Sequence, residues 1–363
     1  MTATVQKVAV LGAGSWGTAF AKIVADAAAE QNSGVCTVLW GRNPEAMEES
    51  ARTQTNQKYF PGVRLPEGIE FTADIEHALR GAQLVVVAVP AQSLRAFLRE
   101  CVHFLEPDAV LLSLAKGLEQ GTQQRMSQVI CAVLQEAGDS VEVARSRVAV
   151  LSGPNLAREI VAEQPTASVI AAAEESIAQK IARLTACSYF RPYTGTDIVG
   201  VEIGGLAKNV IALCVGMCEG MGYGDNSKAS VITRGLAEIT RLALALGAEP
   251  ATMSGLAGVG DLVATCSSPL SRNHTAGRLL AEGVKPQDLA SAMSQTAESV
   301  KTAPVVVELA REHGVEMPIS EAVVAVLSEQ LDIAELAPRL LGRTLKNENS
   351  TASLSAGTEH RKD

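Results

Sequence analysis

A glycine-rich turn close to the first residue constrains the fold more than any other feature. Four apolar residues, Val8–Leu11, lead into Gly12-x-Gly14-x-x-Gly17, and the helical spacing of Thr18–Ala29 follows. This order of strand, tight turn and helix gives the dinucleotide-binding fingerprint its meaning. Gly12 permits the turn, Gly14 lets a pyrophosphate approach the backbone, and Gly17 lets the helix pack against the strand. Because the start of such a helix attracts an anion, we predict a dinucleotide site here rather than an ordinary glycine-rich turn.

Length and composition limit the class of protein. The 363 residues suggest about two domains of ~100–200 residues each. Hydrophobic residues make up 47% of the chain and aromatic residues 3%, so a large aliphatic core is expected. The net charge of −9, with no block of Lys or Arg, argues against a general nucleic-acid surface. A small basic pocket for an anionic metabolite is still compatible with this charge.

The cysteines and the start of the chain indicate where the protein works. Most of the seven cysteines stand within apolar runs, which favours buried thiols. No other Cys or His lies close enough in sequence to Cys214 and Cys218 to complete a zinc set, so no metal is expected. The chain enters its first strand almost at once, which predicts no signal peptide, and we expect no apolar stretch of the ~18 residues that span a membrane. These features predict a cytoplasmic protein.

Strands and helices alternate through the first half of the chain. Strands are predicted at Val35–Trp40, Ile69–Thr72, Leu84–Val89, Ala109–Leu114, Val148–Leu151, Ala167–Ala171 and Tyr189–Tyr193, with helices at Glu45–Arg52, Asp74–Arg80, Ser93–Phe104, Gln123–Glu136 and Glu175–Thr185. Several of these strands are unbroken apolar runs, which is typical of parallel strands buried on both faces. The alternation predicts an α/β fold, a doubly wound Rossmann-type sheet with helices on both faces.

The pattern changes after Thr196. No strand is predicted between Asp197 and Leu341. Helices are predicted at Ile198–Met221, Ser227–Leu246, Asn273–Ala281, Pro286–Met293, Lys301–His313 and Pro318–Leu327. We therefore expect a dinucleotide-binding domain at 1–196, an all-helical substrate-binding domain at 197–346 and a disordered tail at 347–363.

The end of the second predicted strand bears on the choice of cofactor. An acidic residue there would bind the ribose 2′-hydroxyl of NAD, but this chain has Gly41-Arg42-Asn43. An arginine suits a 2′-phosphate, so NADP(H) is the expected preference and NAD(H) the second cofactor. The alternative is that Arg42 is a solvated loop residue.

Loops at the carboxyl ends of the parallel strands should line the ligand crevice. Three such loops stand out: Val89-Pro90-Ala91-Gln92, Ala115-Lys116-Gly117-Leu118-Glu119 and Ser152-Gly153-Pro154-Asn155. Lys116 is the only cation among them. If it opened a helix, the helix dipole would disfavour it there, which favours a functional role over that of a surface lysine.

The long helix Ile198–Met221 is apolar nearly all round and should be buried. Adjacent Gly204 and Gly205 suggest that something lies against its backbone. Lys208 would then be poorly solvated, and both burial and a nearby cation such as Lys116 would lower its pKa. A lysine poised near neutrality can act as a general base, although a lysine snorkelling from a helix interface is the alternative.

Two helix starts carry further polar groups. Asp261 and Thr265 lie one turn apart on one face, so Asp261 could pair with Lys208 or a substrate hydroxyl, or be an ordinary first-turn acid. Ser271 resembles an N-cap, and with Arg272 and Asn273 it would form a phosphate cradle or an ordinary capped helix start.

Together these segments resemble NAD(P)-dependent glycerol-3-phosphate dehydrogenase of the bacterial type over residues 7–346. The resemblance rests on Gly12–Ala19, Ala115–Glu119, Ser152–Pro154, Glu202–Asn209, Gly258–Leu262 and Ser271–Asn273. It implies that Lys208 is the proton acceptor. It implies that the substrate contacts Lys116, Asp261, Ser271, Arg272 and Asn273, with Gly153 and Asn155 nearby. It implies that the dinucleotide contacts Ser15, Trp16, Arg42, Ala157 and Glu298, together with Lys116 and Arg272.

The chain departs from the family pattern at three places. Ala91 stands where a serine is frequent, Asn155 where Ser or Thr is frequent, and Ser299 where a glycine usually follows the glutamate, here Glu298. The implied reaction is reversible hydride transfer between the nicotinamide and C2 of dihydroxyacetone phosphate, which makes sn-glycerol 3-phosphate for phospholipid synthesis. The alternatives are a β-hydroxyacid or 2-dehydropantoate type of dehydrogenase and a non-catalytic dinucleotide-sensing protein. The apolar helical domain is compatible with a homodimer.

Overall fold

The core of the first half is one eight-stranded sheet with the order β3-β2-β1-β4-β5-β6-β7-β8. The computed structural model describes residues 5–293 and 299–344, so Glu298 and the predicted tail 347–363 lie outside the described residues. The strands are β1 Lys7–Leu11, β2 Cys36–Trp40, β3 Ile69–Thr72, β4 Leu84–Val87, β5 Val110–Ser113, β6 Val148–Ser152, β7 Thr166–Ala172 and β8 Phe190–Gly195. Every neighbouring pair is parallel except β6 and β7. The first six strands follow the doubly wound order 3-2-1-4-5-6, and the direction of winding reverses between β1 and β4.

Helices cover both faces of the sheet. They are α1 Ser15–Glu30, α2 Pro44–Thr53, α3 Ile75–Leu79, α4 Leu94–Cys101, α5 Met126–Glu136, α6 Val141–Ser146, α7 Ala157–Val161 and α8 Glu175–Thr185, with short 3-10 turns η1 Ala91–Ser93 and η2 Val102–Phe104. Alternate residues of β1 point to opposite faces. Val8 and Val10 pack with α1, α7 and α8, whereas Ala9 and Leu11 pack with α3, α4 and α5. The predicted α/β fold with helices on both faces is confirmed.

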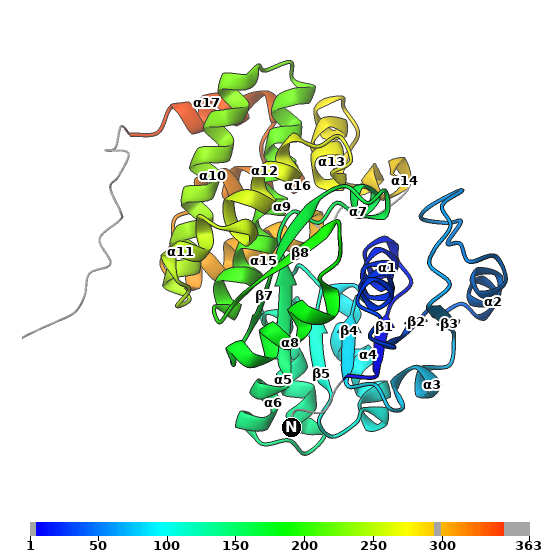
Figure 1. The fold of residues 1–363 in the computed structure, drawn as a ribbon. Helices are drawn as coiled ribbons and strands as arrows, with labels where there is room; N and C mark the ends of the chain where they lie inside the picture. The colour runs from blue at the N-terminus through cyan, green and yellow to red at the C-terminus, as the bar shows by residue number, and fades with distance from the viewer. Residues whose placement is uncertain (1–4, 294–298, 345–363) are drawn as a thin grey trace, which may run out of the picture.

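All described elements after β8 are helical. They are α9 Ile198–Gly220, α10 Asp225–Ala245, α11 Pro250–Met253, the π-helix η3 Leu256–Gly260, α12 Asp261–Ser267, α13 Arg272–Ala281, η4 Pro286–Asp288, α14 Leu289–Ala292, α15 Ser299–Glu312, α16 Pro318–Leu327, η5 Ile333–Glu335 and α17 Leu336–Leu341. Figure 1 shows these helices above the sheet, with α9 between the two parts. The prediction of a helical second part is confirmed.

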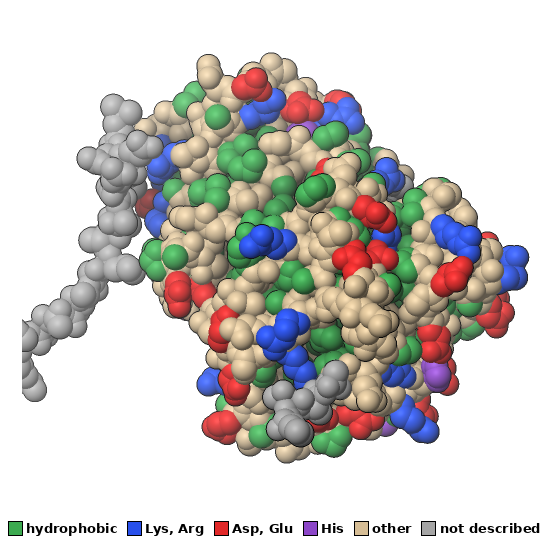
Figure 2. Space-filling view, in the orientation of Figure 1, with side chains coloured by type: hydrophobic (Ala, Val, Ile, Leu, Met, Phe, Trp, Pro, Cys, Tyr) green, Lys and Arg blue, Asp and Glu red, His purple; other side chains and the backbone are tan. Residues whose placement is uncertain are grey.

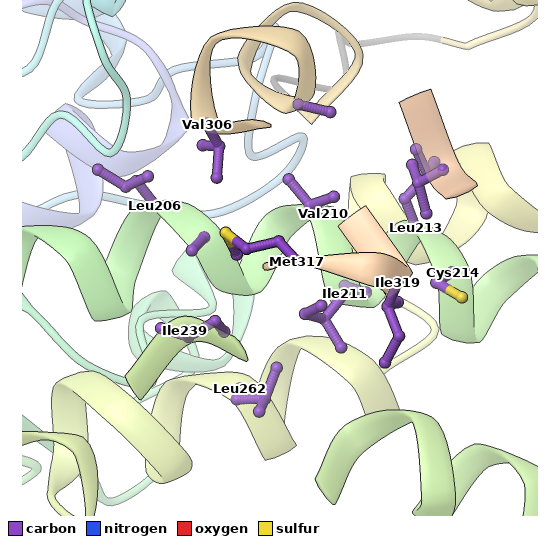
Figure 3. Packing of buried hydrophobic residues seen from close by; sticks show 14 of the residues in the cluster. Leu206, Val210, Ile211, Leu213, Cys214, Ile239, Leu262, Val306, Met317 and Ile319 are labelled. Carbon is purple, nitrogen blue, oxygen red and sulfur yellow. The ribbon is translucent and has the colours of Figure 1, made fainter. Parts of the chain in front are cut away.

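Helix α9 forms the centre of the helical part. Leu206, Val210 and Leu213 belong to one large apolar cluster that also takes in α10, α12, α15 and α16 (Figure 3). By length and composition α9 could span a membrane, because it has 23 residues and its most apolar window has a mean hydropathy of 1.8, so the prediction that no apolar stretch reaches that length was wrong. However, 89% of its most apolar window is buried inside the protein. It is the core helix that its all-round apolar pattern predicted.

The surface carries mixed charges. On the face shown in Figure 2, acidic and basic side chains are interspersed, and hydrophobic side chains lie between them. All seven cysteines are free thiols, and Cys101, Cys214, Cys218 and Cys266 are buried, as their apolar surroundings predicted.

Candidate active site

The glycine-rich turn sits where β1 meets α1, beside the end of β4. Gly12 has a φ of +120°, and a Cβ there would approach Ala88 O at 2.7 Å. A Cβ on Gly17 would overlap the carbonyl of Gly12, so only glycine lets α1 begin this close to the strand. By contrast, a Cβ on Gly14 would meet no atom within 4 Å, and Gly14 caps α1 without a side chain. The first N–H groups of α1 therefore lie beside open space, as an anion site requires.

The first turn of α1 also carries an unpartnered donor. Trp16 is partly buried and packs edge-to-face on Phe20, with ring centroids 5.7 Å apart. Its indole Nε1 is buried and has no hydrogen-bond partner among the described residues. Buried N–H groups without a partner are rare, so this donor suits a ligand that accepts a hydrogen bond at the turn. Ser15, the first residue of α1, is partly buried beside it.

Arg42 lies close to this turn. The N–H of Gly12 donates to Trp40 O at 3.0 Å, so the loop after β2 begins next to the fingerprint. Arg42 is exposed, and Asn43 caps α2 by accepting from the Ala46 N–H at 2.8 Å. The loop thus presents a cation at the end of β2, where the sequence predicted contact with the cofactor ribose.

A buried carboxylate joins two lysines from distant parts of the chain. Asp261 Oδ1 pairs with Lys208 Nζ, and Asp261 Oδ2 pairs with Lys116 Nζ at 2.7 Å. Lys208 Nζ also donates to Thr265 Oγ1 at 2.6 Å, and Lys116 Nζ donates to Gly153 O at 3.0 Å. Asp261 is fully buried. The sequence left the partner of Asp261 open, and the structure pairs it with Lys208.

Burial decides the chemistry of Lys208. Its side chain is only 6% exposed, so it does not snorkel to the surface. The pKa of Lys208 is lowered to about 8, because burial and, to a smaller extent, the cation of Lys116 outweigh the opposing effect of Asp261. The predicted direction and its causes are confirmed. An amine with this pKa exchanges a proton near neutral pH.

Lys116 occupies a different setting from the predicted one. It lies in the long loop between β5 and α5, and α5 begins ten residues later at Met126. Lys116 therefore does not open a helix, and the predicted effect of a helix dipole on it was wrong. Its side chain is held inside the protein, 14% exposed, by Asp261 and the backbone of Gly153.

The two glycines of α9 make room for this cluster. A Cβ on Gly204 would approach Ala257 O in η3 at 2.5 Å. A Cβ on Gly205 would overlap Ser152 Oγ and lie 3.6 Å from the Lys116 side chain. Something does lie against the helix backbone, as predicted: η3 on one side, and the end of β6 with Lys116 on the other.

The start of α13 is a capped helix end next to α9. Ser271 Oγ accepts from the His274 N–H at 3.3 Å, which confirms the predicted N-cap. Arg272 is exposed at the first helical position. Asn273 is buried; its Nδ2 donates to Asn209 Oδ1 at 2.8 Å, and its Oδ1 accepts from the Ser299 N–H at 3.2 Å. Sequence reasoning assigned no role to Asn209, although it directly follows Lys208.

The loop after β6 contributes the remaining described residues. Gly153 has a φ of +135°, and a Cβ there would approach Ser168 Cα at 3.0 Å. Asn155 Oδ1 accepts from Ser168 Oγ, whereas its buried Nδ2 has no partner among the described residues. Ala157 begins α7. The structure therefore brings Gly153 to the lysine cluster through Lys116, with Asn155 on the same loop and Ala157 at the start of the helix that follows it.

Comparisons with known proteins identify the family. The family model described as NAD-dependent glycerol-3-phosphate dehydrogenase N-terminus matches residues 7–178, and its C-terminal counterpart matches residues 197–338. A relative from Streptomyces griseus named glycerol-3-phosphate dehydrogenase (NAD(P)+) is 52% identical over 342 residues, which cover 94% of this chain and 98% of the relative. One of the same name from Nocardia farcinica is 53% identical over 350 residues, covering 94% and 99%.

Solved structures separate the family from the predicted alternatives. The crystal structure of glycerol-3-phosphate dehydrogenase from Coxiella burnetii is 32% identical, with a TM-score of 0.84, and the match covers 93% of this chain and 99% of that one. A ketopantoate reductase of the PanE/ApbA family from Ralstonia eutropha is 16% identical, with a TM-score of 0.53 and coverage of 92% and 100%, which shows a likeness of fold alone. The chain therefore belongs to the NAD-dependent glycerol-3-phosphate dehydrogenase family.

Proposed function

We propose that this chain is an oxidoreductase that reversibly reduces dihydroxyacetone phosphate to sn-glycerol 3-phosphate, with NADPH as the preferred cofactor and NADH as the second. The observation that carries the proposal is the buried Lys208, paired with Asp261 beside Lys116. A dinucleotide-sensing protein needs the glycine-rich turn but has no use for a buried amine with a pKa of about 8. Family membership supports glycerol 3-phosphate as the substrate, since the names of the relatives include it.

Lys208 is the proton donor and acceptor in this proposal. When bound, the nicotinamide cofactor supplies or accepts the hydride at C2 of the substrate. In the reductive direction, protonated Lys208 gives its proton to the C2 oxygen. In the oxidative direction, the neutral amine accepts the proton of the C2 hydroxyl. Asp261 and Thr265 hold the amine in place by hydrogen bonds.

Lys116 stabilises charge on the reacting oxygen. Its Nζ and that of Lys208 share Asp261, so both cations face the same small region. A fixed cation placed where negative charge develops lowers the barrier, because it need not reorganise during the reaction.

The helix start at Ser271, Arg272 and Asn273 holds the phosphate of the substrate. The positive end of the helix dipole and the guanidinium of Arg272 favour a dianion there. Fixing the remote phosphate orients C2 for hydride transfer. Gly153 and Asn155 lie on the loop that also binds Lys116, and we place them at the substrate.

The cofactor lies along the glycine-rich turn. Gly12, Gly14 and Gly17 admit its pyrophosphate, and Arg42 binds the 2′-phosphate of NADPH. The Nε1 of Trp16, which has no partner among residues 5–293 and 299–344, fits a cofactor acceptor atom. The further cofactor contacts implied by the resemblance complete the proposal: Ser15, Lys116, Ala157, Arg272 and Glu298.

The remaining proposals concern the whole protein. We place the enzyme in the cytoplasm, where it supplies glycerol 3-phosphate for phospholipid synthesis. We propose domains at 1–196 and 197–346 and a homodimer. Sedimentation equilibrium tests the dimer, and a monomer mass at micromolar concentration would contradict it.

A substrate comparison tests the proposed activity. Oxidation of NADPH is followed by absorbance with dihydroxyacetone phosphate, dihydroxyacetone or 2-dehydropantoate as the acceptor. We expect turnover with dihydroxyacetone phosphate far above that with the other two. Faster turnover of 2-dehydropantoate, or binding of NADPH without turnover of any of them, would contradict the proposal.

A further inference from the structure

The loop that carries Lys116 is fastened to the helical part of the protein. Leu118 is fully buried and belongs to the apolar cluster around α9, not to the clusters of the sheet. The loop is closed by an antiparallel bridge between Leu118 and Arg125, and the N–H of Glu119 donates to Gln124 O at 2.9 Å. The position of Lys116 therefore depends on how this loop sits against α9.

A buried glutamate of α9 binds the end of this loop. Glu202 is only 8% exposed. Its Oε1 accepts from the Ser127 N–H at 2.8 Å, and its Oε2 accepts from Ser127 Oγ at 2.6 Å and pairs with Arg125. The Ser127 N–H lies in the first turn of α5, where backbone donors lack partners within the helix. Glu202 thus caps α5 from the other half of the protein.

We propose that Glu202 is a positioning residue, which fixes the Lys116 loop against α9 so that Lys116 and Lys208 meet at Asp261. Its effect on catalysis rests on the proposed function. Glu202, Gly205 and Lys208 follow at intervals of three residues along one continuous helix. Glu202 binds Ser127 at the end of the loop, and Lys208 pairs with Asp261. Between them, Gly205 leaves room for the Lys116 side chain, which would lie 3.6 Å from a Cβ at this position. One rigid helix therefore sets the spacing of the two lysines.

Glu238 offers a matched control for the structural part of this role. It is another buried glutamate, 2% exposed, and it caps α16 by accepting from the N–H groups of Ile319 and Ser320 at 2.7 and 3.2 Å. It touches neither the Lys116 loop nor the lysine cluster. Substitution of either glutamate disturbs a buried helix cap, but only substitution of Glu202 is expected to displace Lys116.

The test uses Glu202→Ala, Glu202→Gln and Glu238→Gln in the full chain. We expect Glu202→Ala to lower kcat by about 10–100-fold, as a small misplacement of a catalytic group does, while NADPH affinity is kept. Glu202→Gln retains an acceptor for Ser127 but loses the ion pair with Arg125, so its kcat should fall between those of Glu202→Ala and the wild type. Glu238→Gln should lower the melting temperature measured at pH 5, where Glu238 is protonated, without this loss of kcat.

The pH profile supplies a readout that a structural cap would not move. The charged or titratable groups acting on Lys208 are Asp261, Lys116 and Cys266. Lys116 lowers the pKa of Lys208, so moving Lys116 away should raise it. The rising limb of kcat/KM for glycerol 3-phosphate oxidation should then shift to higher pH in the Glu202 variants. Unchanged kcat and an unshifted limb, with a loss of stability like that of Glu238→Gln, would overturn the proposal.

A measurement without turnover separates this inference from the proposed function. The pKa of Lys208 can be followed by NMR of the lysine side chains, with the signal assigned through Lys208→Met. An upward shift in Glu202→Gln supports the positioning role even if the wild type fails to reduce dihydroxyacetone phosphate, a failure that would overturn the proposed function alone. An unshifted pKa in an active enzyme would overturn the role of Glu202 alone.

Discussion

Lys208 derives its chemistry from its place on a helix with almost no polar face. Residues 200–218 of α9 are all buried, so Asp261 and Thr265, rather than water, are the hydrogen-bond partners of the amine. A lysine on an exposed helix would stay charged at neutral pH. Here burial brings its pKa to about 8, which suits a group that must both give and take a proton.

Replacing Lys208 tests this role directly. Lys208→Met keeps the length of the side chain and removes the amine, so NADPH should still bind while kcat falls by ~10²–10⁴-fold. In glycerol 3-phosphate oxidation the wild-type kcat/KM should rise through about pH 8, because only the neutral amine accepts a proton. The pH profile of the Lys208→Met variant should lack this rise. Lys228→Met, on the surface helix α10, is the control; a Lys208→Met enzyme that kept most of its kcat would send the search to Lys116 or Asp261.

Arg272 tests the site of the phosphate. Loss of a charge-assisted contact costs ~1.5–3 kcal/mol, so Arg272→Leu should raise the KM for dihydroxyacetone phosphate by about 10- to 150-fold. Dihydroxyacetone, which has no phosphate, should be affected far less. Arg278→Leu is the control, since Arg278 lies on the same helix and pairs with Glu282. Equal losses with both substrates would place the phosphate elsewhere.

Arg42 tests the choice of cofactor. Because its cation is expected to bind the 2′-phosphate, Arg42→Ala should raise the KM for NADPH much more than that for NADH. Steady-state kinetics with both cofactors at a fixed concentration of dihydroxyacetone phosphate gives the comparison. Arg52→Ala, at the far end of α2, serves as the control. Equal effects of Arg42→Ala on both cofactors would remove the argument for an NADP preference.

At the scale of elements, segments whose hydrophobic period and ends are clear were predicted best. Ile69–Thr72, Glu175–Thr185 and Pro318–Leu327 have the predicted bounds, because each is a clear period with a distinct end. Helices α6, α7, α11 and α17 were not predicted, since segments of four to six residues are too short to show a period. The antiparallel direction of β7 was also missed. An apolar run indicates a strand but not its direction.

The residues that make up the site were easier to predict from the sequence than the contacts between them. Lys116 and Asp261 are 145 residues apart in sequence, and no local pattern says that they meet. The pairing of Asn273 with Asn209 and the cap that Glu202 forms on α5 likewise depend on how the helical part docks on the sheet. For the cap on α5, the one signal in the sequence was a glutamate, Glu202, within a helix that is apolar nearly all round.

Glu238 yields a prediction for element stability. Burial raises the pKa of Glu238 to about 7, against the N–H groups of α16 that favour its anion. The unfolded chain has a carboxyl pKa near ~4.3, so between these values the folded protein binds more protons, and its free energy of unfolding falls as the pH rises through about 7. Glu238→Gln should lack this contribution, which is on the order of 3 kcal/mol. Urea denaturation at pH 5 and pH 8 gives the comparison, and equal pH slopes for both proteins would contradict it.

At the scale of the whole molecule, the sheet and the helical part meet through charge as well as packing. Lys116 comes from a loop of the sheet, Lys208 from α9 and Asp261 from α12, and the carboxylate is the shared counter-ion of both amines. The buried lysine is tolerated only because this carboxylate and Thr265 replace water around it. The cluster that serves the reaction therefore also helps to hold the two parts together.

Asp261→Asn separates these two effects. Removing one partner of a buried ion pair costs ~3–5 kcal/mol, so the free energy of unfolding should fall by an amount of this order. Asp261 also raises the pKa of Lys208, so in the variant the rising limb of kcat/KM for glycerol 3-phosphate oxidation should move to lower pH. This shift is opposite to the one expected for Glu202→Gln, which removes the influence of a cation. Asp225→Asn, in an exposed pair with Lys228, should change neither quantity. A limb that moved to higher pH in Asp261→Asn would mean that Asp261 does not act as the counter-ion of Lys208 in the working enzyme.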